Sequence, residues 1–208
     1  MSPRAHQLTL PGSDPVTPAT ARGDIPSGLV YEADLISEEE EQTLAARIAI
    51  IDFEEVTMHG RTARRTVRHF GYRYIYGTGE AVSPAEPIPD WLLSLRDRCA
   101  DLAAAPSDDL VEALVTRYPP GAGIGWHRDA PMFGSRVAGV SLLSPCRMRF
   151  QRGTGERRQV WSLDLAPRSG YVLGGASRWA WQHTIPPIRA LRYSITFRTV
   201  RGRDATAG

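Results

Sequence analysis

From residue 112 to residue 200, the chain consists of short apolar segments separated by turns rich in glycine or proline. Within residues 146–151, Cys, Met and Phe alternate with polar side chains, which is the two-residue period of a strand with one buried face. Many short strands separated by such turns predict a sandwich, a jelly roll or a barrel. The candidate strands are residues 112–118, 124–129, 136–143, 146–152, 159–165, 170–174, 180–185 and 191–200.

The first half of the chain has a different pattern. Ser37 precedes Glu40 by three residues, the spacing of a capping box, and predicts a helix that begins there. A second helix is predicted at about residues 90–105, where apolar residues share one side. Residues 1–27 lack periodicity and are rich in Pro, Thr, Ser, Gly and Ala, so we interpret them as a disordered arm before a single domain at 28–203.

Between the two helices, residues 53–76 are predicted to be extended. Residues 77–89 contain three prolines and two glycines and are predicted to form a loop.

Positive charge is concentrated in the later part of the chain. All 25 basic residues are arginines, and the net charge is +2. Residues 1–60 carry three arginines and eleven acids, whereas residues 61–208 carry twenty-two arginines and twelve acids. Because arginine grips phosphates bidentately and stacks on bases, this distribution fits a nucleic-acid partner. A genome composition that favours arginine fits equally well, so charge alone does not assign the partner.

The two cysteines, Cys99 and Cys146, lie far apart in the sequence and do not suggest a disulfide framework. We interpret both as small buried apolar side chains. No apolar run reaches the roughly 18–20 residues of a membrane span, and no apolar stretch of a secretory signal is visible. We therefore expect a cytoplasmic monomer without a membrane partner.

One pair of residues points to a metal. His127 and Asp129 stand two positions apart, so on an extended segment both side chains leave the same face. His183, in a later candidate strand, can complete a set of two histidines and one carboxylate. Such a set leaves three coordination positions open and is typical of non-haem Fe(II) oxygenases. Zinc hydrolases use the same ligand types, and a lone His-x-Asp pair can also belong to an ordinary core histidine.

The last predicted strand carries two arginines on one side. Arg192 and Arg198 alternate with an apolar set that must pack against a layer outside the sheet, so the arginines are predicted to point into the interior. Two buried guanidinium groups need anionic partners, and a dicarboxylate such as 2-oxoglutarate would provide them. The alternative is an edge strand on which both arginines face solvent.

Three segments together resemble a known family. Residues 116–129 (TRYPPGAGIGWHRD), residues 174–178 (GGASR) followed by His183, and residues 192–198 (RYSITFR) stand in the order and spacing of the AlkB-like dioxygenases. The match runs from about residue 70 to residue 200.

The resemblance implies a mixed α+β fold and a cofactor set. The fold is a double-stranded β-helix (jelly roll) core at about residues 112–200, with supporting N-terminal helices and a nucleotide-recognition lid at about residues 53–88. The cofactor is Fe(II), with 2-oxoglutarate and O₂ as co-substrates. His127, Asp129 and His183 match the iron ligands at the catalytic centre.

The resemblance also implies a 2-oxoglutarate site. Arg192 matches the arginine that grips the distal carboxylate, and Tyr118 matches a tyrosine that hydrogen-bonds the same group. Arg198 matches the arginine near the carboxylate that is lost as CO₂. Thr116 stands where AlkB-like enzymes often carry an asparagine that contacts the co-substrate.

For the substrate, the resemblance implies alkylated nucleobases in DNA or RNA, which the enzyme would hydroxylate or oxidatively demethylate. Tyr72 and Tyr74 match the lid that covers the nucleotide. Arg64 and Arg65, in the basic stretch just before them, suit contacts to phosphates. A solvated basic hairpin beside core tyrosines is the alternative interpretation.

One departure from the family limits the substrate assignment. The best-known repair members carry an acidic residue two positions after the ligand aspartate, where it contacts the damaged base, but Ala130 and Pro131 follow Asp129 here. Three substrate classes therefore stay open: alkylated DNA or RNA, a tRNA that the enzyme modifies, and a protein side chain that it demethylates.

Overall fold

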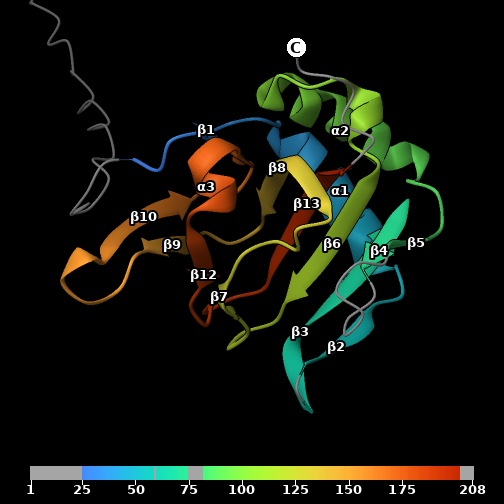
Figure 1. Ribbon diagram of the computed structural model, residues 1–208. Coiled ribbons are helices and arrows are strands. Elements are labelled where there is room, and N and C mark those ends of the chain that lie inside the picture. The colour runs from blue at the N-terminus through green and yellow to red at the C-terminus, as the bar shows by residue number, and fades with distance from the viewer. Residues whose placement is uncertain (1–24, 59, 75–81, 202–208) are drawn as a thin grey trace, which may run out of the picture.

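Two antiparallel sheets face each other in the computed structural model (Figure 1). The structure describes residues 25–58, 60–74 and 82–201, and at residues 58, 61, 73, 74 and 82 it describes the backbone only. The larger sheet has, in spatial order, the strands β1 (Leu29–Glu32), β11 (Gly170–Leu173), β8 (Phe133–Leu142), β13 (Arg192–Val200), β6 (Glu112–Tyr118), β3 (Arg61–Phe70) and β2 (Glu54–Met58). The smaller sheet has β10 (Gln159–Leu165), β9 (Cys146–Arg152), β12 (Gln182–Ile185) and β7 (Ile124–His127). This arrangement confirms the predicted jelly-roll core.

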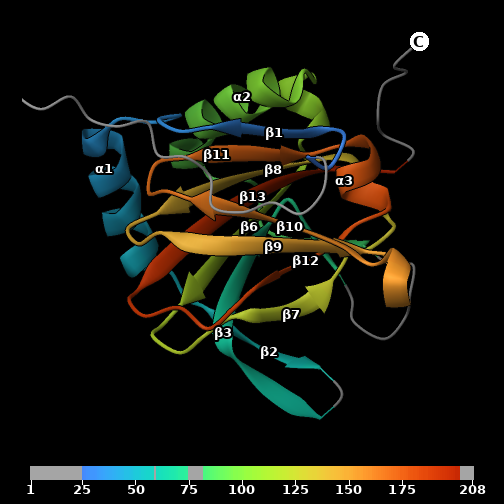
Figure 2. The same cartoon turned by 90° about the vertical axis from the view of Figure 1, so that its left-hand side faces the viewer.

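Two helices cover the outer face of the larger sheet, α1 (Glu38–Ala49) and α2 (Asp90–Ala103) (Figure 2). Helix α1 begins as the sequence predicts: Ser37 Oγ accepts a hydrogen bond from the Glu40 backbone N–H at 3.2 Å, and the Ser37 N–H donates to the Glu40 side chain at 2.9 Å. Both capping-box bonds are therefore present, and they satisfy two backbone N–H groups at the helix start.

Strand β13 separates two hydrophobic layers. Tyr193, Ile195 and Phe197 face the helices and belong to a layer built with α1 and α2. A second layer, which includes Phe150 and Trp181, lies between the two sheets. Alternation along one strand thus gives the larger sheet an apolar face toward the helices and a mixed face toward the smaller sheet.

Five short elements complete the described fold. A two-stranded sheet forms from β4 (Tyr72–Tyr74) and β5 (Val82–Pro84), so the predicted loop at 77–89 is wrong at residues 82–84. Tyr72 pairs with Pro84 there, and the pairing supplies backbone partners that the Gly and Pro pattern did not indicate. The remaining elements are α3 (Gly175–Trp179), η1 (Ser107–Asp109) and η2 (Gly155–Arg157).

The described chain begins close to α3. The Ser27 carbonyl accepts a hydrogen bond from the Ser177 N–H at 2.9 Å, at the C-terminal end of the arm predicted at residues 1–27. The rest of that arm, residues 1–24, lies outside the described residues. The helices of the described chain are too short and too polar to cross a membrane. Cys99 and Cys146 are buried free thiols, as predicted.

Candidate metal and co-substrate site

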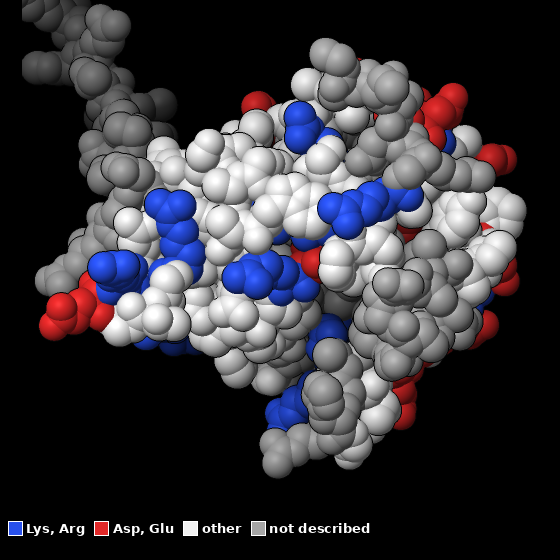
Figure 3. All heavy atoms as spheres, viewed as in Figure 1, with Lys and Arg blue, Asp and Glu red and all other residues white. Residues whose placement is uncertain are grey.

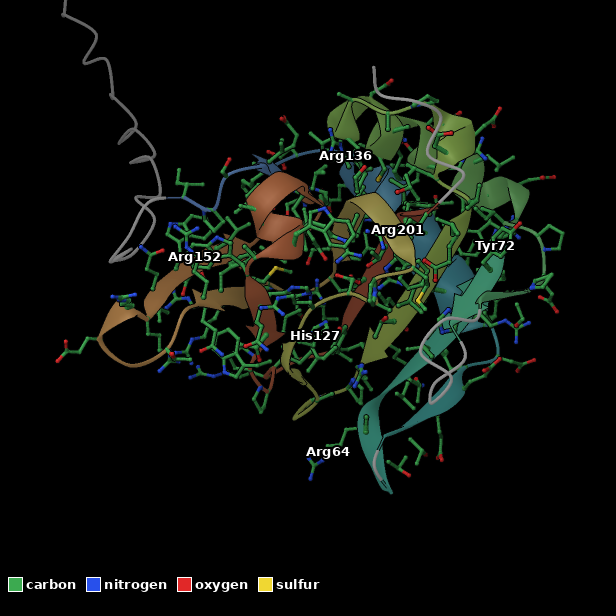
Figure 4. The ribbon with its side chains drawn as sticks, viewed as in Figure 1. Arg64, Tyr72, His127, Arg136, Arg152 and Arg201 are labelled. Carbon is green, nitrogen blue, oxygen red and sulfur yellow. The ribbon has the colours of Figure 1, made fainter. Side chains whose placement is uncertain are left out.

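A cavity of about 840 Å³ opens between the two sheets. Its walls include His127 and His183 from the smaller sheet and Arg198 from the larger one, with Asp129 just after β7. A hollow is visible on this side of the molecule (Figure 3), and His127 lies between the sheets in the same view (Figure 4). The sequence-predicted metal ligands therefore share one cavity.

Strand pairing brings the two histidines together. His183 on β12 is the direct cross-strand partner of His127 on β7, and their ring centroids are 4.2 Å apart. His183 Nε2 lies 3.7 Å from Asp129 Oδ2. Because the register decides which side chains are opposite each other, residues 56 positions apart in the sequence become neighbours.

The donor set fits a divalent metal after a small contraction. No three His, Cys, Asp or Glu side chains of the described chain converge closely enough to form a closed ligand set. Two ligands at right angles on an octahedral ion, each about 2.1 Å from it, lie about 3.0 Å apart. The 3.7 Å separation of His183 and Asp129 must therefore shorten by less than about 1 Å. His127 Nδ1 donates to the Gly125 carbonyl at 2.9 Å, which leaves Nε2 available for a metal.

The protonation states at the site also suit a metal. Burial, together with the nearby His127, lowers the pKa of His183 to about 3. Burial lowers the pKa of His127 as well. Burial by itself would raise the pKa of Asp129, but Arg198 and the two histidines outweigh it and hold this pKa well below its usual range. At neutral pH the site thus presents two neutral imidazoles and one carboxylate, the forms in which these groups bind metals.

Arg198 joins Asp129 to a second buried carboxylate. Its Nε and Nη2 donate to Asp129 Oδ1 at 3.1 and 2.8 Å, and its Nη1 lies 3.1 Å from Glu112 Oε2. His69 Nδ1 is 3.1 Å from the other oxygen of Glu112, whose side chain has no exposed surface. The structure thus directs Arg198 to protein carboxylates, whereas the resemblance implies that it faces the co-substrate.

A second buried arginine fixes the backbone after the aspartate. Arg178 on α3 donates four hydrogen bonds to carbonyl groups within residues 129–134, at 2.9–3.2 Å. One of these carbonyls belongs to Asp129 itself. Since Arg178 is 2 % exposed, these bonds are shielded from water and hold the segment that carries Asp129.

Arg192 is buried as predicted, and part of its charge lacks a partner. The residue is 0 % exposed, and its Nε donates to Ser141 Oγ at 3.0 Å. Its Nη1 and Nη2 have no hydrogen-bond partner in the described chain. The guanidinium carbon lies 5.2 Å from the ring centre of Tyr118, the cross-strand partner of Arg192. Tyr118 and Thr116 line the cavity, and Tyr118 separates it from the buried Arg192, which does not line it.

The predicted substrate residues are more dispersed. Arg65 lines the cavity, whereas Arg64 is exposed and its guanidinium lies beside Gly121, in the turn between β6 and β7. Tyr72 lies on the small β4–β5 sheet, away from His127 (Figure 4). The side chain of Tyr74 lies outside the described residues.

Three side chains at the site were not singled out from the sequence: His69, Glu112 and Arg178. The sequence does contain a signal for His69. It stands four positions after Arg65, so on an extended segment both side chains leave the same face of the strand. Glu112 and Arg178 become informative only when their buried partners are known, since an acid or an arginine is ordinarily exposed.

Comparisons with known proteins agree with this geometry. A family model for the 2OG-Fe(II) oxygenase superfamily matches residues 31–198. The "Alkylated DNA repair protein ALKBH8 homolog" of Arabidopsis thaliana is 29 % identical over 92 % of this chain and 63 % of its own length. The "tRNA (carboxymethyluridine(34)-5-O)-methyltransferase ALKBH8" of Mus musculus is 30 % identical over 78 % of this chain and 25 % of its own length. The "Alpha-ketoglutarate-dependent dioxygenase AlkB" of Escherichia coli is 29 % identical, over 64 % and 65 %.

Solved structures support the fold. The structure of OsALKBH1 superimposes with a TM-score of 0.60 at 16 % identity, covering 85 % of this chain and 100 % of the other. A Pseudomonas putida prolyl-4-hydroxylase superimposes with a TM-score of 0.58 at 14 % identity, covering 84 % and 93 %. The chain spans less than two thirds of the length of its first sequence relatives. By the family match and these relatives, the chain belongs to the 2OG-Fe(II) oxygenase superfamily, among its AlkB-like members.

Proposed function

We propose that the chain is an Fe(II)/2-oxoglutarate-dependent dioxygenase that hydroxylates or oxidatively demethylates alkylated nucleobases in DNA or RNA. His127, Asp129 and His183 hold the iron. Iron, 2-oxoglutarate and O₂ together supply the oxidation of a substrate C–H bond, with succinate and CO₂ as the other products. The residues of the chain hold the metal, orient the co-substrate and substrate, and keep water from the reacting atoms.

Arg192 is the observation that carries this proposal. A buried guanidinium with two unpartnered nitrogens costs several kcal/mol unless an anion compensates it. A carboxylate of 2-oxoglutarate matches this fork, and the nearby Tyr118 and Thr116 line the cavity from which it would enter. Because Arg192 is fully covered by protein, we expect neighbouring side chains, Tyr118 among them, to shift when the co-substrate binds.

Succinate formation tests the proposed chemistry. With Fe(II), 2-oxoglutarate and O₂, the wild-type protein should form succinate slowly even without a substrate. His127→Ala and Asp129→Ala should reduce this to background and weaken Fe(II) binding measured directly by titration. Arg47→Ala, an exposed arginine on α1, is the matched control and should behave as wild type. Full turnover in either ligand variant would exclude the proposed metal site.

Arginines around the cavity support a polyanionic substrate. Arg65 and Arg128 line the cavity, and no described acid forms an ion pair with either. In Figure 4, Arg201 and Arg64 lie above and below His127, whereas Arg152 lies farther out, near the end of β9. Unpaired arginines around a cavity suit phosphate contacts, and a base must leave its stack to enter such a pocket.

Salt dependence tests the nucleic-acid assignment. Binding of single-stranded oligonucleotides should weaken steeply with salt, and the double variant Arg64→Ala with Arg65→Ala should reduce the salt slope by about 1 for each phosphate contact removed. Arg47→Ala, on the helices behind the larger sheet, should leave the slope unchanged. Absent or salt-independent binding would favour a protein substrate instead.

A second candidate function is the modification of tRNA. The names of several relatives, including the Mus musculus protein, refer to tRNA carboxymethyluridine. Mass spectrometry after incubation with iron and 2-oxoglutarate separates the candidates. Loss of a methyl group from methylated DNA or RNA oligonucleotides supports demethylation, whereas a gain of one oxygen on a tRNA nucleoside supports tRNA modification.

A further inference from the structure

We propose that His69 is a specificity-determining residue whose Nε2 accepts a hydrogen bond from an N–H group of the substrate inside the cavity. The inference rests on the proposed function and names a contact within it. His69 lies on β3 and lines the cavity that also contains His127, Asp129 and His183. It thus borders the same cavity as the metal ligands, and it also lines a smaller pocket with Glu54 and Arg68.

A buried carboxylate fixes the orientation of the His69 ring. Glu112 has no exposed surface and takes hydrogen bonds from Arg198 Nη1 at 3.1 and 3.3 Å. A carboxylate that accepts bonds from an arginine acts as an acceptor only, so at the 3.1 Å contact His69 Nδ1 is the donor. In the neutral ring the lone pair then lies on Nε2, and the ring cannot turn without losing the Glu112 bond.

His69 Nε2 has no hydrogen-bond partner among the residues that the structure describes. An acceptor oriented by a buried anion, on the wall of a cavity, is available for a ligand. The exocyclic amine of an adenine or cytosine ring is an N–H donor of the required kind, whereas guanine and thymine present a carbonyl oxygen at the corresponding position.

The segment after Asp129 explains why such a contact is needed. Ala130 and Pro131 line the cavity after Asp129 and offer neither a charge nor a side-chain hydrogen bond. On the β3 wall, Arg65 provides a cation suited to phosphate, and His69 provides the anchored acceptor. Recognition of a base edge is therefore assigned to β3 and not to the segment after the metal-binding aspartate.

The same carboxylate connects this contact to the metal site. Glu112 holds His69 with one oxygen and Arg198 with both, and Arg198 holds Asp129. A substitution at Glu112 would disturb Asp129 as well, so it cannot test His69 alone. Variants of His69 itself are required.

Two substitutions separate recognition from structure. The amide of Asn in His69→Asn can occupy the position of Nδ1 and keep the bond to Glu112, but it has no group at the position of Nε2. The longer amide in His69→Gln reaches the position of Nε2 but does not reproduce the Glu112 bond. If His69 has a purely structural role, His69→Asn should bind substrate like the wild type and His69→Gln should bind it less well. If His69 recognises the substrate, His69→Asn should lose substrate selectivity and His69→Gln should keep part of it.

The decisive measurement is a double-mutant cycle with the substrate as one partner. Two single-stranded oligonucleotides carry the same N-methylated base, with its exocyclic amine in one and with hydrogen in its place in the other. Their Kd values are measured without O₂, with iron and 2-oxoglutarate bound, so that no turnover occurs. In the wild-type protein, loss of the amine should weaken binding about 3- to 10-fold, the effect of one hydrogen bond.

In His69→Asn the two oligonucleotides should bind equally, and in His69→Gln part of the preference should remain. A wild-type preference that persists in His69→Asn overturns the inference, and so does a wild-type protein that binds both oligonucleotides equally while oxidising nucleic acid. The last result leaves the proposed function intact. A wild-type protein that forms no succinate overturns both. The wild-type comparison does not depend on the folding of any variant.

Discussion

The two sides of the larger sheet differ in what they bury. Toward α1 and α2, strand β13 presents Tyr193, Ile195 and Phe197 to a layer of apolar side chains. Toward the smaller sheet, the same strand presents Arg192 and Arg198, both buried, beside a cavity of about 840 Å³. The outer layer is closely packed and nonpolar, whereas the inner layer contains charges, histidines and space for ligands.

This difference separates stability from function. An apolar layer gains free energy in proportion to the area that it buries. A layer with buried charges loses free energy unless each charge is paired, so such a layer persists when the rest of the fold is stable enough to support it. The outer layer therefore supports the inner one, and substitutions in the two should have different consequences.

The largest expected effect lies in the outer layer. Phe197→Ala removes a side chain with 0 % exposure and should lower the free energy of unfolding by about 3–5 kcal/mol. Denaturant unfolding measures this directly. Ser194→Ala on the opposite side of β13 is the comparison and should cost less than about 1 kcal/mol. Equal losses for the two variants would show that the two layers do not differ as described.

Arg192→Met should have the opposite effect on stability, because it removes a buried charge and not a buried apolar side chain. It removes two unpartnered buried nitrogens, so the free energy of unfolding of the ligand-free protein should stay the same or rise. The stabilisation by 2-oxoglutarate, about 2.7 kcal/mol when the ligand is at 100 times its Kd, should disappear. Thermal unfolding with and without metal and 2-oxoglutarate measures both quantities. A variant that retains the ligand-induced shift would contradict the co-substrate site.

Arg178→Lys tests a buried arginine that, unlike Arg192, donates hydrogen bonds from all three of its guanidinium nitrogens. A lysine cannot reproduce the four donor positions of the planar fork, so the free energy of unfolding should fall by about 2 kcal/mol. Arg152→Lys, at an exposed position, should change it by less than about 0.5 kcal/mol. If both variants unfold alike, the carbonyl contacts of Arg178 contribute nothing to stability.

The smallest effect is expected on the surface of the outer layer. A hydrogen bond from Arg98 lowers the pKa of Glu40 from 4.5 to about 2, and the backbone of Ser37 adds to this. Because the folded-state pKa is the lower one, the stabilisation is complete above pH 4.5 and is lost as the pH falls through about 2. Since Glu40 is 39 % exposed, solvent screening limits the effect to less than about 1 kcal/mol.

The pH dependence of unfolding measures this contribution between pH 2 and pH 5. Glu40→Gln should remove the corresponding slope and keep part of the helix cap. An unchanged slope in this variant would assign the acid sensitivity to other carboxylates.

Much of the fold follows from local patterns. The predicted strands at 112–118, 146–152 and 159–165 have the observed bounds, because alternation and turn residues are local properties of the chain. The strand β5 at residues 82–84 was missed because its partner β4, not its own composition, makes it a strand. Helix α3 was missed because five residues are too few to show helical periodicity.

The candidate site likewise has some features that local sequence patterns indicate and others that only the packing of strands decides. Motif order and spacing indicated His127, Asp129 and His183, and strand pairing placed two of them directly opposite each other. Their roles as iron ligands stay predictions. The positions of Arg64 and Tyr72 relative to the cavity could not be derived from the sequence, since a basic or aromatic strand residue can face either side of a sheet edge.

The sequence by itself determined the alternation of β13, which turns the arginines toward the interior, and the metal-ligand types and spacing. The tertiary structure decided what those arginines contact. Arg198 meets Glu112 across 86 positions of sequence, and Glu112 meets His69 across 43. Such contacts depend on which strands are neighbours and in what register, and the local period of a strand, which repeats every two residues, carries no information about either.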